Sequence, residues 1–247
     1  MSTIDITPHE GEQRAIAIAS FLAELRLAGH NGGIVFDDPV SSLDHNWRKR
    51  VADRLVDEAT CRQVIVLTHD TTFLADLHDA IERQAVDHLI LHLEWMNGRP
   101  GHVFVGNPWE HQSYKERLDA LETTQRAMGK TWPLHPSASD RETMCRQYSL
   151  LRATIERVIE TLVLGCVVER YRHNVRVGNL KQVRAFTSGD CKAFLQLHDK
   201  CCELVDAHDH SSAKNAPVPD AVQLGADIQT LKALTESIKT RQTMQSV

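Results

Sequence analysis

The sequence lacks the cysteine spacing that marks a disulfide framework or a zinc site. Its 247 residues include six cysteines, none of which belongs to a C-x-x-C pair, and Cys201 and Cys202 are adjacent. The first residues also lack the charged and apolar segments of a signal peptide. These absences favour a protein that works in the reducing cytoplasm.

Long apolar runs and an excess of positive charge are absent as well. The longest apolar runs, such as residues 64–67 and 162–168, fall far short of the roughly 20 residues that span a bilayer as a helix. We therefore expect no membrane partner. The formal net charge is −5, so no global feature marks a nucleic-acid surface, and any binding of DNA or RNA would depend on a local basic patch.

The composition is that of a folded globular chain. Hydrophobic residues make up 42% of the sequence and charged residues 25%, which is enough apolar surface for a sizeable core. Internal repeats and low-complexity tracts are absent. At roughly 100–200 residues per domain, the length fits one large domain or two small ones.

The first half of the chain alternates between helical and strand patterns. Short apolar runs over residues 33–36 and 64–68 are typical of buried strands in a parallel sheet, and Asn97-Gly98 predicts a tight turn between two further strands. This alternation predicts an α/β lobe with a mainly parallel sheet over residues 1–110. The other elements expected in this lobe are helices over residues 12–28, 44–59 (begun by Asp44 or His45) and 71–83, and strands over 88–95 and 102–105.

The pattern changes after residues 107–112, where we place a boundary. Beyond it only helical spacing recurs, interrupted by a break over residues 132–137. Leu150, Leu151 and Ile155 belong to an apolar stripe that predicts ordinary helix packing. We expect an all-α region over residues 111–247, with helices at 114–128, 141–172, 190–206 and 220–240.

Two adjacent carboxylates follow the first expected strand. Asp37 and Asp38 would therefore lie at the carboxyl edge of the sheet, where α/β proteins bind ligands. One carboxylate can hold the water shell of Mg²⁺ and the other can orient an attacking water, which are two tasks of phosphoryl transfer. The alternative is that Asp37-Asp38-Pro39 is only a strand end that enters a turn.

Two further signals bear on the same edge. His69 ends the neighbouring strand and can reach the same crevice to hydrogen-bond a γ-phosphate, although such a histidine is otherwise a packed or capping residue. Upstream, Gly11 lies within Glu10-Gly11-Glu12-Gln13 at the start of a helix. A glycine there offers free backbone N–H groups and the positive end of the helix dipole to an anion.

Taken together, the motifs resemble the ABC-type ATPase heads of the SMC/RecF-like branch of P-loop NTPases. The likeness extends to large bacterial AAA-family ATPases in which a coiled coil interrupts the head, a group that includes anticodon nucleases and other phage-defence proteins. It covers about residues 7–110 with specific motifs and implies ATP and Mg²⁺ as cofactors. It makes Glu10, Gly11, Glu12 and Gln13 the signature motif, Ile34–Asp38 Walker B with Asp37 at Mg²⁺ and Asp38 as general base, Ser42 and Asp44 part of the D-loop, and His69 the switch histidine.

The chain departs from that family pattern in three places. Pro8 and His9 stand where the signature usually begins Leu-Ser, and Asp38 stands where a glutamate is usual. A Walker A motif is missing, because the Gly129-Lys130-Thr131 segment has Thr124 in place of the first glycine.

A missing Walker A makes the expected site a shared one. We expect either the C-terminal piece of a longer ATPase or a protein that supplies half a site, completed in a homodimer or by a Walker A-bearing partner. Without the backbone nest and lysine of a P-loop, the chain alone is expected to bind ATP weakly or not at all.

The helical half raises two alternatives. Arg152 and Glu156 stand four residues apart on one helix, which most simply predicts a solvated, salt-bridged face. The family resemblance implies instead a ribonuclease site in which Arg152, Glu156 and His208 or His210 act on RNA. A third hypothesis is that the chain is a non-catalytic remnant whose helices bind a partner protein.

Overall fold

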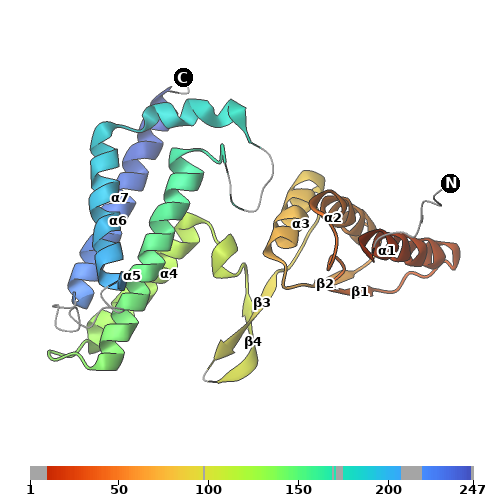
Figure 1. The fold of residues 1–247 in the computed structure, drawn as a ribbon, viewed down its shortest axis with the longest axis horizontal. Helices are drawn as coiled ribbons and strands as arrows, with labels where there is room; N and C mark the ends of the chain where they lie inside the picture. Colours follow the sequence, from red (N-terminus) through yellow and green to blue (C-terminus); the bar gives the residue numbers. More distant parts are fainter. Residues whose placement is uncertain (1–9, 97, 169, 171–174, 207–218, 246–247) are drawn as a thin grey trace, which may run out of the picture. The chain divides into compact units, whose positions relative to one another are not determined.

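The computed structural model describes residues 10–96, 98–168, 170, 175–206 and 219–245 (Figure 1). Contacts divide the chain into two compact units, Met1–His111 and Gln112–Val247. Each unit has its own secondary structure and its own core, so each is described by itself.

The first unit is built on a small parallel sheet, as the alternation of strands and helices predicts. β1 (Ile34–Asp37) pairs with β2 (Val64–Leu67) in a register that runs from Ile34 opposite Val64 to Asp37 opposite Leu67. The connection between the strands contains α2 (His45–Ala59), which is the crossover that parallel pairing needs. The other helices of the layer are α1 (Glu10–Leu27) and α3 (Thr71–Gln84).

Only one face of this sheet is covered by the helices. Ile34 and Phe36 are buried and join a core with residues of α1, α2 and α3. The alternate side chains of the same strands point the other way, and Val35, Ile65 and Leu67 are 59%, 42% and 50% exposed. The strands therefore have one packed face and one open face, although we expected them to be buried.

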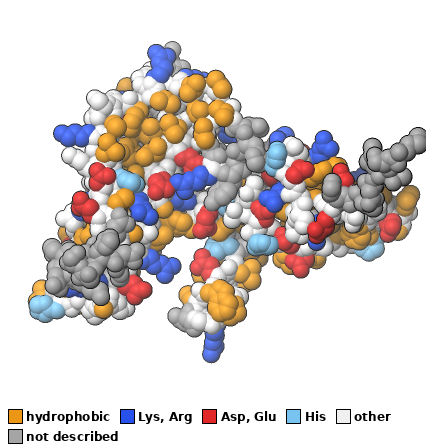
Figure 2. All heavy atoms as spheres, viewed as in Figure 1, with side chains coloured by type: hydrophobic (Ala, Val, Ile, Leu, Met, Phe, Trp, Pro, Cys, Tyr) orange, Lys and Arg blue, Asp and Glu red, His pale blue; other side chains and the backbone are white. Residues whose placement is uncertain are grey.

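β3 (Leu91–Met96) and β4 (Arg99–Val105) form a separate antiparallel hairpin. This corrects two expectations, because β3 begins three residues later than predicted and β4 begins three residues earlier. The short connection around Gly98, whose φ is 74°, allows only antiparallel pairing, so these strands do not extend the parallel sheet. Figure 2 shows hydrophobic side chains on the hairpin surface, where Trp95 is 74% exposed.

The second unit is helical throughout the part that the structure describes. Its long helices pack side by side in Figure 1, with α5 against α6 and α4 against α7. Leu151, Ile155 and Leu231 are fully buried between them. The helices are α4 (Tyr114–Thr131), α5 (Ala138–Val158), α6 (Ser188–Asp206) and α7 (Ala221–Gln245), and short turns of helix occur at η2 (Ile159–Val163) and η3 (Val177–Ala185), with η1 (Trp109–His111) in the first unit.

The helix expected over residues 141–172 is shorter than predicted. It begins at Ala138, because Ser137 and Asp140 form a capping box, and it ends at Val158 in a π turn. Gly165 and Cys166 then adopt a φ of 57° each, which reverses the chain. A Cβ on Gly165 would lie 2.4 Å from the Gln182 side chain, so a larger residue would have to displace that side chain and adopt a positive φ. Residues 169, 171 and 172 of the expected helix lie outside the described residues.

A buried polar cluster joins α5, α6 and α7. The Tyr148 hydroxyl donates a 2.6 Å hydrogen bond to Asp227, and the Lys200 ammonium lies 2.6 Å from the same carboxylate. Burial raises the pKa of Tyr148, and the hydrogen bond to Asp227 adds to the shift. Every partner in this cluster is satisfied, so the cluster fixes how the three helices meet.

Tyr148→Phe tests that cluster. Removing the hydroxyl leaves one oxygen of the buried Asp227 carboxylate with a partner fewer, and we expect the free energy of unfolding to fall by about 2 kcal/mol. Urea denaturation followed by the helical circular dichroism signal measures the change. An unfolding free energy equal to that of the wild type would show that the hydroxyl contributes nothing.

Candidate functional site

Asp37 and Asp38 stand where β1 ends, at the carboxyl edge of the parallel sheet. The Asp38 backbone N–H donates a 2.7 Å hydrogen bond to the Leu67 carbonyl, which continues the ladder one residue past β1. The φ of Asp38 is 43°, a left-handed conformation that aspartate tolerates better than most residues. The chain therefore turns sharply at Asp38 and directs the next residues away from the sheet.

The Asp38 carboxylate lies between two side chains of the neighbouring strand end. Thr68 donates its hydroxyl to Oδ1 at 3.4 Å, and Nδ1 of His69 lies 3.5 Å from Oδ2. The Asp38 side chain is 26% exposed, whereas His69 is 86% exposed. The structure thus brings Asp38 and His69 together, with the histidine projecting into solvent beside the carboxylate.

Asp37 lies on the open face of the sheet beside Leu67, and its side chain is exposed. Within the described residues its carboxylate has no hydrogen bond or ion pair. In the same part of the chain, no group of three or more His, Cys, Asp or Glu side chains is arranged to hold a metal. Mg²⁺ commonly takes only one or two protein carboxylates and fills its remaining positions with water and phosphate oxygens. An exposed, unpartnered carboxylate next to a second one fits that donor set.

The loop that follows Asp38 is held firmly against α1. Val40 and Leu43 are buried in the core, at 0% and 4% exposure. Arg14 of α1 donates from Nη1 to the Asp38 carbonyl at 3.3 Å and to the Ser41 carbonyl at 3.0 Å. Arg14 is a positioning residue that the sequence did not reveal, because its partners are backbone carbonyls that become available only in this turn.

Glu10, Gly11 and Ser42 meet at the start of α1. The Ser42 hydroxyl donates to Oε1 of Glu10 at 3.2 Å, and Ser42 has a φ of 69°. A Cβ on Gly11 would lie 2.7 Å from the Ser42 carbonyl oxygen, so the helix can approach the loop only with glycine there. Glu12 and Gln13 are exposed on the same turn of α1.

Asp44 and Asp70 cap the helices that leave the sheet edge. Asp44 accepts hydrogen bonds from the backbone N–H groups of Asn46 and Trp47 at 2.8 and 3.0 Å. Of the two residues expected to begin this helix, Asp44 is the N-cap and His45 is the first helical residue. Asp70 caps α3 and also forms a 2.8 Å ion pair with Arg48, whose Nε donates to the Leu43 carbonyl. Arg48 thus ties the loop after β1 to the loop after β2.

Gly11→Ala tests the contact between α1 and this loop. The added methyl group forces the first turn of α1 away from Ser42, and we expect a loss of about 1–3 kcal/mol of unfolding free energy in the first unit. Hydrogen exchange at α1 and at residues 38–43 locates the loss. Gly129→Ala is the matched control, because nothing lies closer than 4.0 Å to its Cβ and an exposed helical site gains from alanine.

In the predicted nuclease site, Arg152 and Glu156 contact other residues and not each other. Glu156 forms a 2.6 Å ion pair with Arg170, while Nη1 of Arg152 lies 4.0 Å from the Cys202 sulfur. No contact joins Arg152 to Glu156 in the described part of the unit. His208 and His210 lie outside the described residues, so the nuclease site stays a prediction.

The Gly129-Lys130-Thr131 segment is the last turn of α4. A phosphate-binding loop needs several backbone N–H groups that point to one centre, whereas this segment is regular helix. The structure therefore agrees that it is no Walker A. None of the described helices is long and apolar enough to cross a membrane.

Comparisons with known proteins bear on the first unit. The family model of the AAA domain matches residues 2–102, which include β1, β2 and all of the site residues around Asp38. The match supports a relation of this region to AAA-type ATPases, which depend in general on a nucleotide and Mg²⁺. No curated protein and no solved structure matches the chain.

Proposed function

We propose that the first unit supplies the Walker B half of a composite ATPase site, and that a Walker A motif carried elsewhere completes it. The observation that carries the proposal is the Asp38 carboxylate at the carboxyl edge of two parallel strands, with Thr68 and His69 beside it and Asp37 exposed next to it. The AAA-domain match over the same residues supports the proposal.

Asp37 is proposed to act at Mg²⁺. Its carboxylate is exposed and unpartnered within the described residues, so no ion pair has to be broken before it takes the water shell of a cation. When bound, the cation supplies charge neutralisation for the phosphates. The remaining ligands would come from outside the described residues, because these hold no metal-binding cluster of their own.

Asp38 and His69 are proposed to act on the water and the terminal phosphate. The Thr68 hydroxyl and the His69 ring hold the Asp38 carboxylate from two sides, leaving it partly exposed to accept a proton from a nearby water. The His69 side chain is 86% exposed, so its ring is accessible to a phosphate oxygen and can donate a hydrogen bond to it. The lack of a lysine-bearing phosphate loop explains why these groups need a second component.

Glu10, Gly11, Glu12 and Gln13 are proposed to face the nucleotide of the opposing component, together with Ser42 and Asp44. In support, the Glu10–Ser42 hydrogen bond and the close approach at Gly11 join the start of α1 to the loop after β1. The start of α1 and this loop are therefore proposed to move together when the nucleotide binds. From the resemblance of the motifs, we propose that such a device works in a DNA- or RNA-processing or phage-defence system of the cytoplasm.

ATP turnover tests the proposal. The isolated chain is expected to show none, and turnover is expected when a Walker A-bearing protein (a second chain or a longer form of this one) is added. His69→Ala should then lower turnover by about a hundredfold, with His88→Ala as a control on an exposed ring outside the edge. ATP binding by the isolated chain with a dissociation constant of about 1 µM or below would contradict the proposal.

A further inference from the structure

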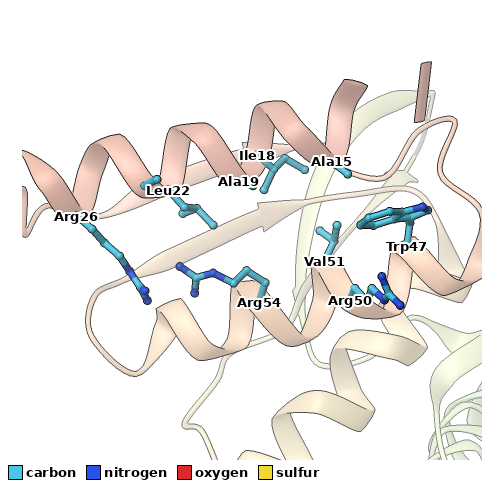
Figure 3. A pocket seen from close by; sticks show the side chains of 10 residues that line it. Ala15, Ile18, Ala19, Leu22, Arg26, Trp47, Arg50, Val51 and Arg54 are labelled. Carbon is cyan, nitrogen blue, oxygen red and sulfur yellow. The ribbon is translucent and has the colours of Figure 1, made fainter. Parts of the chain in front are cut away.

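A groove between α1 and α2 combines an apolar floor with an arginine rim (Figure 3). Its volume is about 330 Å³, and ten residues line it, of which three are arginines and none is acidic. Leu22 of α1 and Val51 of α2 close the floor, and the half-buried Ile18 and Trp47 contribute accessible apolar surface. This is a local excess of positive charge on a chain whose net charge is −5.

The rim arginines keep an excess of charge after their internal ion pairs are counted. Arg26 and Arg54 both reach Oε2 of the buried Glu58, at 3.1 and 2.7 Å, and Arg62 lies 2.9 Å from Oε1. A single carboxylate thus faces three guanidinium groups. Arg50 stacks over the Trp47 ring at 5.1 Å and is exposed, so its charge adds to the excess.

Two of the three acidic side chains of α2, Asp53 and Asp57, have partners in α3 and none in the groove. Asp53 pairs with Arg83 of α3, and Asp57 accepts a 2.7 Å hydrogen bond from Gln84. The third, Glu58, is the buried carboxylate that Arg26 and Arg54 share. The three arginines of the rim thus have one buried carboxylate, Glu58, as counter-charge, and the rim keeps an excess of positive charge.

We propose that the groove binds an acidic amphipathic helix of a partner protein. The lining runs along α1 from Ala15 to Arg26, about 16 Å at 1.5 Å per residue, which matches three turns of a docked helix. The face of α1 that lines the groove has small side chains, which let another helix approach closely; these are Ala15, Ala19 and Ala23. Apolar anchors at i, i+3 or i+4, and i+7 fill the floor, and glutamates on the flanks meet the rim.

The apolar floor distinguishes this partner from a nucleic acid. A phosphate backbone remains hydrated and interacts through its charge, so it would bind the arginines and leave the half-buried Ile18 and Trp47 unused. An acidic amphipathic helix uses both features at once, because its burial removes apolar surface from water while its carboxylates pair with the guanidinium groups.

Two synthetic helical peptides test the proposal with the full chain. Both have leucine at the anchor positions, and one has glutamate elsewhere while the other has lysine. Fluorescence anisotropy is expected to give the acidic peptide a dissociation constant on the order of 10 µM or below, and no binding of the basic one. Binding should weaken with added salt, because the rim is exposed.

Matched variants locate the binding. Arg50→Glu should raise the dissociation constant of the acidic peptide about tenfold or more. Lys49→Glu makes the same charge change one residue earlier and should alter that dissociation constant less than about threefold. Ala19→Trp fills the groove and should abolish binding, whereas Ala17→Trp, which lies outside the lining, should not. Circular dichroism verifies that each variant is folded.

Three results would overturn the proposal. The first is equal binding of the acidic and basic peptides, or binding of neither. The second is acidic-peptide binding that survives both Arg50→Glu and Ala19→Trp. The third is competition by a single-stranded oligonucleotide at this groove, which would show that the groove binds a nucleic acid. Self-association of the chain that Ala19→Trp abolishes would likewise show that the groove binds a second copy of the chain.

Discussion

Asp38→Asn is expected to lower ATP turnover of the completed complex by about a hundredfold or more. The amide cannot accept the proton of an attacking water, yet it keeps the size of the carboxylate and can still accept the hydrogen bond from Thr68. Asparagine also tolerates the φ of 43° that this position requires, so the turn should persist. Steady-state phosphate release at saturating ATP measures the effect.

A control variant and a measurement of ATP binding show whether a loss of turnover comes from Asp38 itself. Asp87→Asn removes the same charge from an exposed site outside the edge and should leave turnover unchanged. ATP binding by the Asp38→Asn complex should remain, because the carboxylate is proposed to act on water and not on the phosphates. Turnover equal to that of the wild type would exclude Asp38 as the base.

Glu58→Gln is expected to destabilise the first unit by about 3 kcal/mol, the largest stability effect that we expect. Glu58 is 1% exposed and is the shared partner of Arg26, Arg54 and Arg62. A neutral amide leaves three guanidinium groups without their counter-charge. Urea denaturation, with hydrogen exchange at α2 to resolve the first unit, measures the loss.

The ion-pair cluster also predicts how stability depends on pH. Burial alone would raise the pKa of Glu58, but the hydrogen bond and charge of Arg54, with the charges of Arg26 and Arg62, bring it below the ordinary value of 4.5. The contribution of Glu58 is therefore fully present above pH 4.5 and is lost as the pH falls through the lowered pKa. Glu82→Gln, at an exposed site of α3, should change neither stability nor its acid dependence.

The strands and the helix cap of the first unit could be predicted from the sequence, because apolar runs and capping residues are local signals. The runs that became β1 and β2 end in polar residues, and their spacing leaves room for a crossover helix, so parallel pairing followed. Asp44 was recognisable as a cap from its position before a helical pattern. The placement of Asp38 near His69 is a consequence of the same pairing, since parallel strands end at the same edge.

Other features depend on contacts that no local pattern encodes. Arg14 reaches backbone carbonyls 24 and 27 residues away, and Gly11 is required by a carbonyl of the loop after β1. The early end of α5 is followed by a π turn and by the reversal at Gly165, where the Gln182 side chain lies against the glycine. The open face of the sheet was also unforeseen, because Val35 and Ile65 have the apolar character of buried residues.

Mn²⁺ binding to the ATP-loaded complex, followed by electron paramagnetic resonance, tests most directly whether the sheet edge is half of a nucleotide site. The proposed division of labour predicts that the wild type and Asp38→Asn both bind nucleotide-dependent Mn²⁺, whereas Asp37→Asn binds it at least about tenfold more weakly. Asp87→Asn should match the wild type. Undiminished Mn²⁺ binding by Asp37→Asn would contradict the assignment of this edge to the metal and its nucleotide.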